Sequence, residues 1–320
     1  MVIFIIALFG HTAEPQAGIS DDGQRLHPGP RWGHVFIYDP ARDNVLLFGG
    51  GLEQGVYRND TWTWDGLRWT FHDIRGPAAR GFAAATFDES RQTVVLHGGR
   101  ANDSTTFSDS WEWDGSQWRE IEPQGVYKAD HHQMVYVPSE QAIIAYGGWT
   151  GEGVTGQTWK WANGWSRLSQ GIPPARAAFA MALDTHKEEI YLFGGLWISG
   201  QYADLWKWQR GEWVSLSGPY DHSSIDHLAM VYDSSRRKFV AFGGKDYRRI
   251  MKSNTLLISA STIEILSLDG PSARHSIGLT YDRRKHQTLL YGGKEYRGQE
   301  QIALDDMWMW DGAAWKQIEP

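Results

Sequence analysis

Six Gly-Gly pairs, each closing a short apolar run, recur along the chain at nearly constant intervals. The intervals between them are 49, 49, 47, 49 and 49 residues. The pairs begin at Gly49, Gly98, Gly147, Gly194, Gly243 and Gly292. A fixed period of this length indicates one supersecondary unit that is repeated and stacked against its neighbours. The repeat therefore determines the fold.

A group of tryptophans follows the glycine pair in five of the six repeats. Two Trp residues stand at positions i and i+2, and a third follows after a turn. The groups are Trp62/Trp64/Trp69, Trp111/Trp113/Trp118, Trp159/Trp161/Trp165, Trp206/Trp208/Trp213 and Trp308/Trp310/Trp315. Residues at i and i+2 share one face of a strand, so we expect these rings to pack against a neighbouring sheet. A sugar-stacking row is the functional alternative.

Each repeat contains four short segments with the pattern of β-strands. In the first repeat they are residues 33–38, 44–48, 61–64 and 68–72, which we call strands a, b, c and d. Asp-Gly pairs, as at Asp65-Gly66, are typical of the tight turn that joins two antiparallel strands. The 36 glycines and 13% aromatic residues also favour short strands and turns. We predict an all-β fold.

Glycine pairs at the end of strand b, followed by Trp after a loop, resemble the kelch family of β-propellers. The resemblance covers residues 28–320 and implies a six-bladed β-propeller with four antiparallel strands per blade and strand a innermost. The expected blades are approximately 28–76, 77–125, 126–172, 173–219, 220–270 and 271–320. The last strand d lies at the end of the sequence, so closure needs no strand from residues 1–27.

Residues 1–27 form the expected N-terminal segment and linker. Residues 2–9 are an apolar run, too short to span a bilayer and similar to the core of a signal peptide. We therefore expect a secreted or periplasmic protein. The alternatives are a structural strand at residues 2–9 and a cytoplasmic location.

The amino-acid composition argues against several kinds of site and partner. With no cysteine, the chain can form neither a disulfide nor a thiolate metal site. The Cys–Tyr cofactor of the galactose oxidase type of kelch protein is likewise excluded. A formal net charge of −7 disfavours a nucleic-acid partner. No short metal-ligand spacing occurs, and we expect no metal and no cofactor.

Alternating strand directions place the b–c loops and the starts of strand a on one face, which we call the loop face. The a–b and c–d turns lie on the opposite turn face. Because the b–c loops are the longer connections, the loop face is the expected binding face.

Four arginines share one register at the start of strand a, eight residues before the Asp of the a–b turn. They are Arg31, Arg80, Arg176 and Arg274. Peptide-binding kelch proteins use Arg at this entry position, so the resemblance implies a ring that holds an acidic ligand. Guanidinium groups suit carboxylates because two parallel hydrogen bonds match their geometry. The alternative is that each Arg pairs with an Asp of its own blade.

Histidines and loop aromatics complete the candidate site. His34, His131, His132, His227 and His275 gather at the starts of strand a, with Asp130 and Asp226 nearby. We interpret them as channel-lining groups, with metal ligation as the alternative. Four aromatic residues of the b–c loops are further candidates for ligand binding. They are Trp149, Trp197, Tyr247 and Tyr296.

The sequence favours a binding propeller that recognises a protein or glycan ligand, acidic in character, through the loop face. The alternative is a sugar mutarotase resembling N-acetylneuraminate mutarotase, which requires an acid/base pair beside the sugar. No catalytic residue stands out. The chain carries neither a nucleophile motif nor a phosphate-binding loop.

Overall fold

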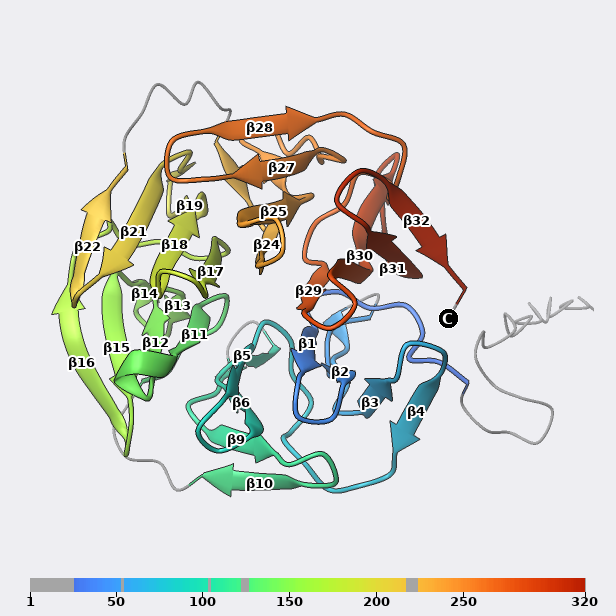
Figure 1. The fold of residues 1–320 in the computed structure, drawn as a ribbon, viewed down its shortest axis with the longest axis horizontal. Helices are drawn as coiled ribbons and strands as arrows, with labels where there is room; N and C mark the ends of the chain where they lie inside the picture. The colour runs from blue at the N-terminus through green and yellow to red at the C-terminus, as the bar shows by residue number, and fades with distance from the viewer. Residues whose placement is uncertain (1–25, 53–54, 103–104, 122–126, 217–223, 320) are drawn as a thin grey trace, which may run out of the picture.

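The computed structural model describes all residues except 1–25, 53–54, 103–104, 122–126, 217–223 and 320. The chain forms six blades around a central axis, with almost no helix (Figure 1). The all-β, six-bladed prediction is confirmed. The interpretation of residues 2–9 as a signal peptide or a strand falls outside the described residues.

Each blade is one repeat, and its four strands pair antiparallel in the order a, b, c, d. The first three blades are β1(Val35–Asp39), β2(Asn44–Phe48), β3(Thr61–Trp64) and β4(Trp69–His72); β5(Ala84–Asp88), β6(Thr93–His97), β9(Ser110–Trp113) and β10(Trp118–Ile121); and β11(Gln133–Val137), β12(Ala142–Tyr146), β15(Gln157–Trp161) and β16(Trp165–Gln170).

The other three blades are β17(Ala180–Asp184), β18(Glu189–Phe193), β21(Leu205–Gln209) and β22(Glu212–Ser215); β24(Ala229–Asp233), β25(Lys238–Phe242), β27(Thr255–Ile258) and β28(Ile263–Leu266); and β29(Gly278–Asp282), β30(Gln287–Arg297), β31(Glu300–Trp310) and β32(Trp315–Ile318). Strand d of the last blade, β32, completes a four-stranded sheet with β29, β30 and β31.

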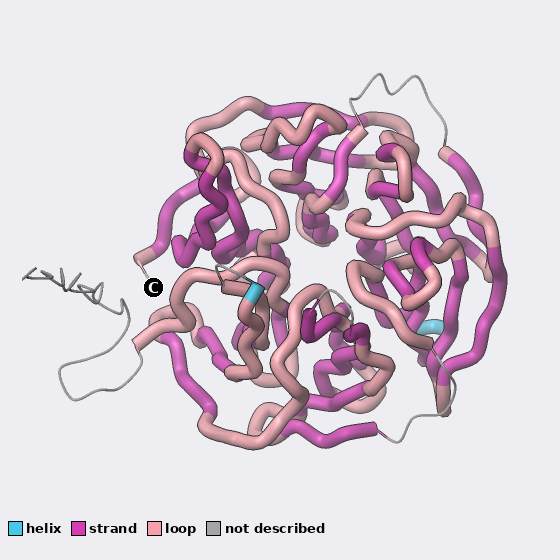
Figure 2. The backbone as a smooth tube through the Cα atoms, turned by 180° about the vertical axis from the view of Figure 1, so that it is seen from behind, coloured by secondary structure: helices cyan, strands magenta, loops and turns pink. Residues whose placement is uncertain are grey.

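Small hairpins on the b–c loops extend the loop face. They are β7(Arg100–Asn102) with β8(Thr105–Thr106), β13(Trp149–Thr150) with β14(Gly153–Val154), and β19(Leu196–Trp197) with β20(Gly200–Gln201). In the fifth blade, β23(Ile225–Asp226) at the start of strand a pairs with β26(Lys245–Asp246) of the b–c loop. The view from behind shows the opposite side of the same ring (Figure 2).

The hydrophobic core of the described chain is divided into six clusters, one between each pair of neighbouring blades. The second and third Trp of each group lie in these clusters. For example, Trp113 and Trp118 pack against Val35, Leu46 and Phe48 of the first blade. The predicted packing role of these rings is therefore confirmed, and burial leaves them no role as a sugar-stacking row.

The third Trp of four blades also forms a hydrogen bond to the preceding blade. Its indole N–H donates to a hydroxyl at the start of strand c. The pairs are Trp118–Thr61, Trp165–Ser110, Trp213–Thr158 and Trp315–Thr255, at 2.8–3.3 Å. These bonds fix each blade's outer strand to its neighbour, because a buried indole N–H gains a partner only in this register.

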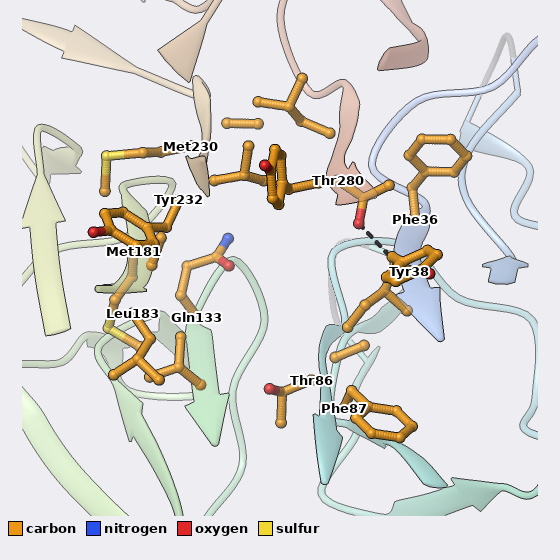
Figure 3. Close-up of a pocket in the computed structure, with 18 of the residues that line it drawn as sticks. Phe36, Tyr38, Thr86, Phe87, Gln133, Met181, Leu183, Met230, Tyr232 and Thr280 are labelled. Atoms are coloured by element: carbon orange, nitrogen blue, oxygen red, sulfur yellow. Dashed lines mark hydrogen bonds between the residues drawn. The ribbon is translucent and has the colours of Figure 1, made fainter. Parts of the chain in front are cut away.

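A cavity of about 310 Å³ runs along the axis and is lined by strand a of all six blades. Figure 3 shows its interior, with the carboxamide of Gln133 among the side chains drawn. Thr280 accepts a hydrogen bond from the backbone N–H of Tyr38 in the next blade at 2.8 Å. Backbone N–H groups on the free edge of strand a thus form hydrogen bonds with side chains of the neighbouring blade, which leaves fewer unpaired groups at the edge.

No helix of the described chain is long and apolar enough to cross a membrane.

Candidate functional site

The four register-sharing arginines lie inside their own blades. Their side chains are at most 2% exposed. In the second blade, Arg80 donates to both carboxylate oxygens of Asp109, at 2.6 and 2.7 Å, and to the carbonyl of Gly98 at 2.9 Å. The other three arginines repeat this arrangement: Arg31 with Asp60 and Gly49, Arg176 with Asp204 and Gly194, and Arg274 with Asp306 and Gly292.

The first Trp of the group also donates a hydrogen bond to this carboxylate. Trp111 donates its indole N–H to Asp109 at 2.7 Å, and Trp62, Trp206 and Trp308 do the same in their blades. Burial alone would raise the pKa of Asp109. The hydrogen bonds and the charge of Arg80 lower it by more than burial raises it, so the pKa lies below its usual value.

The hypothesis that these four arginines form a ligand ring is therefore wrong. A bidentate carboxylate and a backbone carbonyl already bind each guanidinium, and burial removes it from an incoming ligand. In the third blade Ala129 takes the arginine position, and Tyr127 donates to the carbonyl of Gly147 instead, at 2.9 Å. The motif is a structural clamp on the end of strand b.

A second ring, two residues after the arginine position, closes the axis at the loop face. Its members are Gly33, Phe82, His131, Ala178, His227 and Ser276, all with φ between 51° and 61°. The backbone N–H of each donates to the carbonyl of the neighbouring member at 2.7–3.1 Å. The six bonds form a closed circle that uses one residue from every blade.

Three side chains of this ring meet over the axis. The ring centroids of Phe82 and His131 lie 3.5 Å apart in a stacked arrangement. The imidazole of His227, from the blade opposite Phe82, lies 5.3 Å from that of His131 and 6.3 Å from the Phe82 ring. A second, smaller cavity of about 100 Å³ is lined by this ring and by the residues that follow it in strand a.

Each of the two ring histidines is fixed by the carboxylate that precedes it. Nδ1 of His131 lies 2.5 Å from Asp130 Oδ1, and Nδ1 of His227 lies 2.5 Å from Asp226 Oδ1. Thr106 donates to Asp130 at 3.0 Å, and Gln201 donates to Asp226. Nε2 of neither histidine has a hydrogen-bond partner among the described residues.

Burial lowers the pKa of both ring histidines. For His131 the value falls to about 4, because burial and the charges of His227 and Arg100 outweigh the raising effect of Asp130. Burial likewise lowers the pKa of His227 against the raising effect of Asp226. Both imidazoles are therefore neutral at pH 7.

Three cations lie near these rings. Each is the residue directly after the glycine pair of its blade, and we call this position the rim register. The register consists of Gly51, Arg100, Trp149, Leu196, Lys245 and Lys294. Each member pairs through its backbone with the residue after the arginine position of its own blade. Arg100, Lys245 and Lys294 therefore lie at the rim of the closed ring.

Side-chain contacts place the cations beside the aromatic rings. The Arg100 guanidinium lies 5.2 Å from the Phe82 ring, and Lys294 Nζ lies 4.3 Å from the ring of Trp32. Lys245 Nζ lies 3.8 Å from Asp226. Burial, followed by the nearby charges of Lys245 and Arg100, lowers the pKa of Lys294.

We call this group the mouth site. It consists of Trp32, Phe82, Arg100, His131, His227, Lys245, His275 and Lys294. His275 adjoins it through His227, with centroids 5.3 Å apart, and burial followed by that imidazole's charge lowers its pKa to about 2.

The predicted aromatic residues divide into two pairs. Trp149 belongs to the rim register, and Tyr296 lies 6.5 Å from His275. Trp197 and Tyr247 lie farther out on the loops and are 44% and 62% exposed. His34 and His132 lie between blades, beside Tyr291 and His97 respectively, and are apart from the mouth site.

Of the mouth-site cations, Arg100 was missed in the sequence, whereas Lys245 and Lys294 stand out there in two similar b–c loops that place cations on the loop face. The signal that could have found all three is the residue after each glycine pair, which is Arg or Lys in three of six repeats. No group of three or more His, Cys, Asp or Glu in the described chain is arranged to hold a metal ion.

The fold and the mouth site together define a six-bladed β-propeller whose axis is closed at the loop face beneath a cationic and aromatic rim. No protein-family model matches the chain, and no curated protein matches its sequence. The chain is similar to the solved structure described as "Structure of YjhT", with a TM-score of 0.69 and 12% identity over 92% of this chain and 99% of that one. Likeness at this identity shows the fold alone.

Proposed function

We propose that the protein is a binding propeller of the kelch type that recognises an acidic ligand, carried by a protein or a glycan, at the mouth site. The glycine pairs and Trp groups support the kelch assignment. The observation that carries the binding function is the position of Arg100 and Lys294 beside the neighbouring Phe82 and Trp32 rings, whose centroids are 5.3 Å apart. Lys245 lies in the same rim register.

The physical basis is a partly buried cationic rim. Cations held close together repel one another, and a carboxylate or another anion between them relieves that repulsion. The partly exposed Phe82 ring beside Arg100 offers apolar surface to a sugar ring or a peptide side chain, and the buried Trp32 ring contacts Lys294. The mouth site therefore replaces the four arginines as the ligand-binding site, on the same face.

The test is a screen of acidic glycans and acidic peptides against the intact chain, followed by charge removal. Lys245→Ala combined with Lys294→Ala is expected to weaken binding of the best probe at least about tenfold, since charged partners contribute about 1.5–3 kcal/mol each. The control is Lys285→Ala combined with Lys187→Ala, which removes two positive charges from a–b turns on the turn face. Equal affinity of the double variant and the parent would contradict the proposal.

A sugar mutarotase is the second candidate, and the two His–Asp pairs favour it. A carboxylate at Nδ1 orients each imidazole, and Nε2 has no hydrogen-bond partner among the described residues. This is the geometry of a general base, and the cations beside it would hold a sugar carboxylate. The test is the anomerisation rate of N-acetylneuraminate followed by NMR. A rate equal to the spontaneous one would remove this candidate.

A further inference from the structure

The two ring histidines can donate nothing to an anion in their neutral form. The carboxylates of Asp130 and Asp226 are acceptors only, so Nδ1 of each imidazole carries the proton. The remaining nitrogen, Nε2, then presents a lone pair. An oxyanion that approaches Nε2 meets that lone pair, and a hydrogen bond forms only after the ring has taken up a second proton.

The groups that face the two imidazoles make this protonation depend on the occupant of the site. Asp130 and Asp226 favour the charged form, whereas the other charged or titratable neighbours oppose it. Those neighbours are the other ring imidazole, Arg100 from the second blade, His132 from the third, Lys245 from the fifth and His275 from the sixth. The remaining contacts are neutral: Phe82, Thr106 and Gln201.

We propose that an oxyanion bound at the mouth site is held by His131 and His227 in their protonated forms, so that binding takes up protons and the affinity rises as the pH falls. This rests on the proposed acidic-ligand function and adds its regulation. The cations attract the anion at every pH. The histidines add hydrogen bonds to the anion only once they are protonated. This requires the negative charge of the anion to outweigh the effects of burial and of the nearby cations, which keep the imidazoles neutral.

The magnitude follows from linkage. For each proton taken up, affinity rises about tenfold per pH unit between the pKa of the bound form and that of the free form. The free His131 titrates at about pH 4. A bound anion raises the histidine pKa toward neutrality. The increase in anion affinity is therefore expected between pH 7.5 and pH 5.0.

The experiment uses sulfate as the probe, because its charge is constant over this range, with chloride at matched ionic strength as the reference. Calorimetric titration at pH 7.5 and pH 5.0 is expected to give about tenfold or greater tightening at the lower pH. Repeating the titration near pH 5 in two buffers of different ionisation enthalpy measures the protons taken up.

The matched variant is His227→Asn, because asparagine tolerates the left-handed backbone at this position, where φ is 55°. This variant is expected to show a weaker pH dependence of sulfate affinity and a smaller proton uptake on binding, while circular dichroism shows an intact fold. His186→Asn is the control. This half-exposed histidine on the turn face lies 4.0 Å from Asp184, and its variant is expected to keep the parent's pH dependence.

The outcomes separate the two proposals. Sulfate affinity that is equal at both pH values, without proton uptake, overturns the proton-linked inference and leaves the acidic-ligand function standing. Binding of a carboxylated probe without sulfate binding at pH 5.0 also overturns the inference alone. Failure of every anionic probe at both pH values overturns both proposals.

Discussion

Arg80 and Asp109 form a bidentate ion pair, with two hydrogen bonds of 2.6 and 2.7 Å that join the start of strand a to the loop before strand c of the same blade. The arginine is 1% exposed, so the aspartate neutralises a charge that has lost its water. The same pair in three other blades makes it a repeated element of the architecture.

Removal of one partner is expected to destabilise the propeller. Asp109→Ala would leave the Arg80 guanidinium buried without its counter-charge, and the expected loss in free energy of unfolding is about 3 kcal/mol. Chemical denaturation measures it. The control is Arg119→Ala, which removes an arginine that is 77% exposed and paired with Glu112. A clearly smaller loss is expected there, because solvent screens an exposed ion pair. Similar losses in both variants would contradict the structural role of the buried pair.

Trp113 has no exposed surface and lies in the cluster between the first two blades. Trp113→Ala is expected to lower the free energy of unfolding by about 3–5 kcal/mol, because it removes a large ring from a packed core. The control, Leu67→Ala, truncates a side chain that is 87% exposed in a turn. A melting temperature of the Trp113 variant within one or two degrees of the parent would show that the ring does not carry this packing.

Glycine is required at position 98 for two reasons: the backbone has a left-handed angle there, and the neighbouring blade leaves no room for a side chain. Its φ is +65°, and a Cβ there would meet the carbonyl oxygen of Ala129 at 2.4 Å. Gly298 has a φ of +66° but open space around it. Gly298→Ala is expected to cost about 1–2 kcal/mol for the left-handed backbone alone. Gly98→Ala should cost clearly more in urea unfolding, and equal losses would contradict close blade contact as the reason for the glycine pair.

The stability of the propeller is expected to fall as the pH decreases from about 6.5 to 4. Burial lowers the pKa of His34, His97, His131, His132 and His275, and the lowered values for His97 and His131 are about 4. In this interval the unfolded chain binds protons on these side chains and the folded chain does not, so acid favours unfolding. Urea unfolding at a series of pH values measures the slope.

The variant for this prediction is His97→Gln, since His97 is completely buried. It is expected to make the dependence of stability on pH shallower between pH 6.5 and 4, whatever its effect at pH 7.5. An unchanged slope would show that His97 does not titrate with folding.

The fold was predictable from the sequence because it depends on local, repeated signals. The glycine pairs set the blade number, the alternating apolar residues set the strands, and the Trp groups marked the interfaces between blades. Each of these features acts within about 50 residues, and six copies of the pattern reinforced one another.

The binding site required the tertiary structure. Arg80 and Arg100 are both arginines near the loop face, and nothing local in the sequence distinguishes them. Folding of the b–c loop brings Asp109 to Arg80 and buries the pair, whereas Arg100 remains at the rim. Phe82, His131 and His227 come from three blades, and only closure of the propeller brings them together on the axis. The sequence determined the repeating scaffold through local pattern. The tertiary structure decided which charged side chains are buried inside a blade and which lie at the mouth, because both depend on contacts between distant residues.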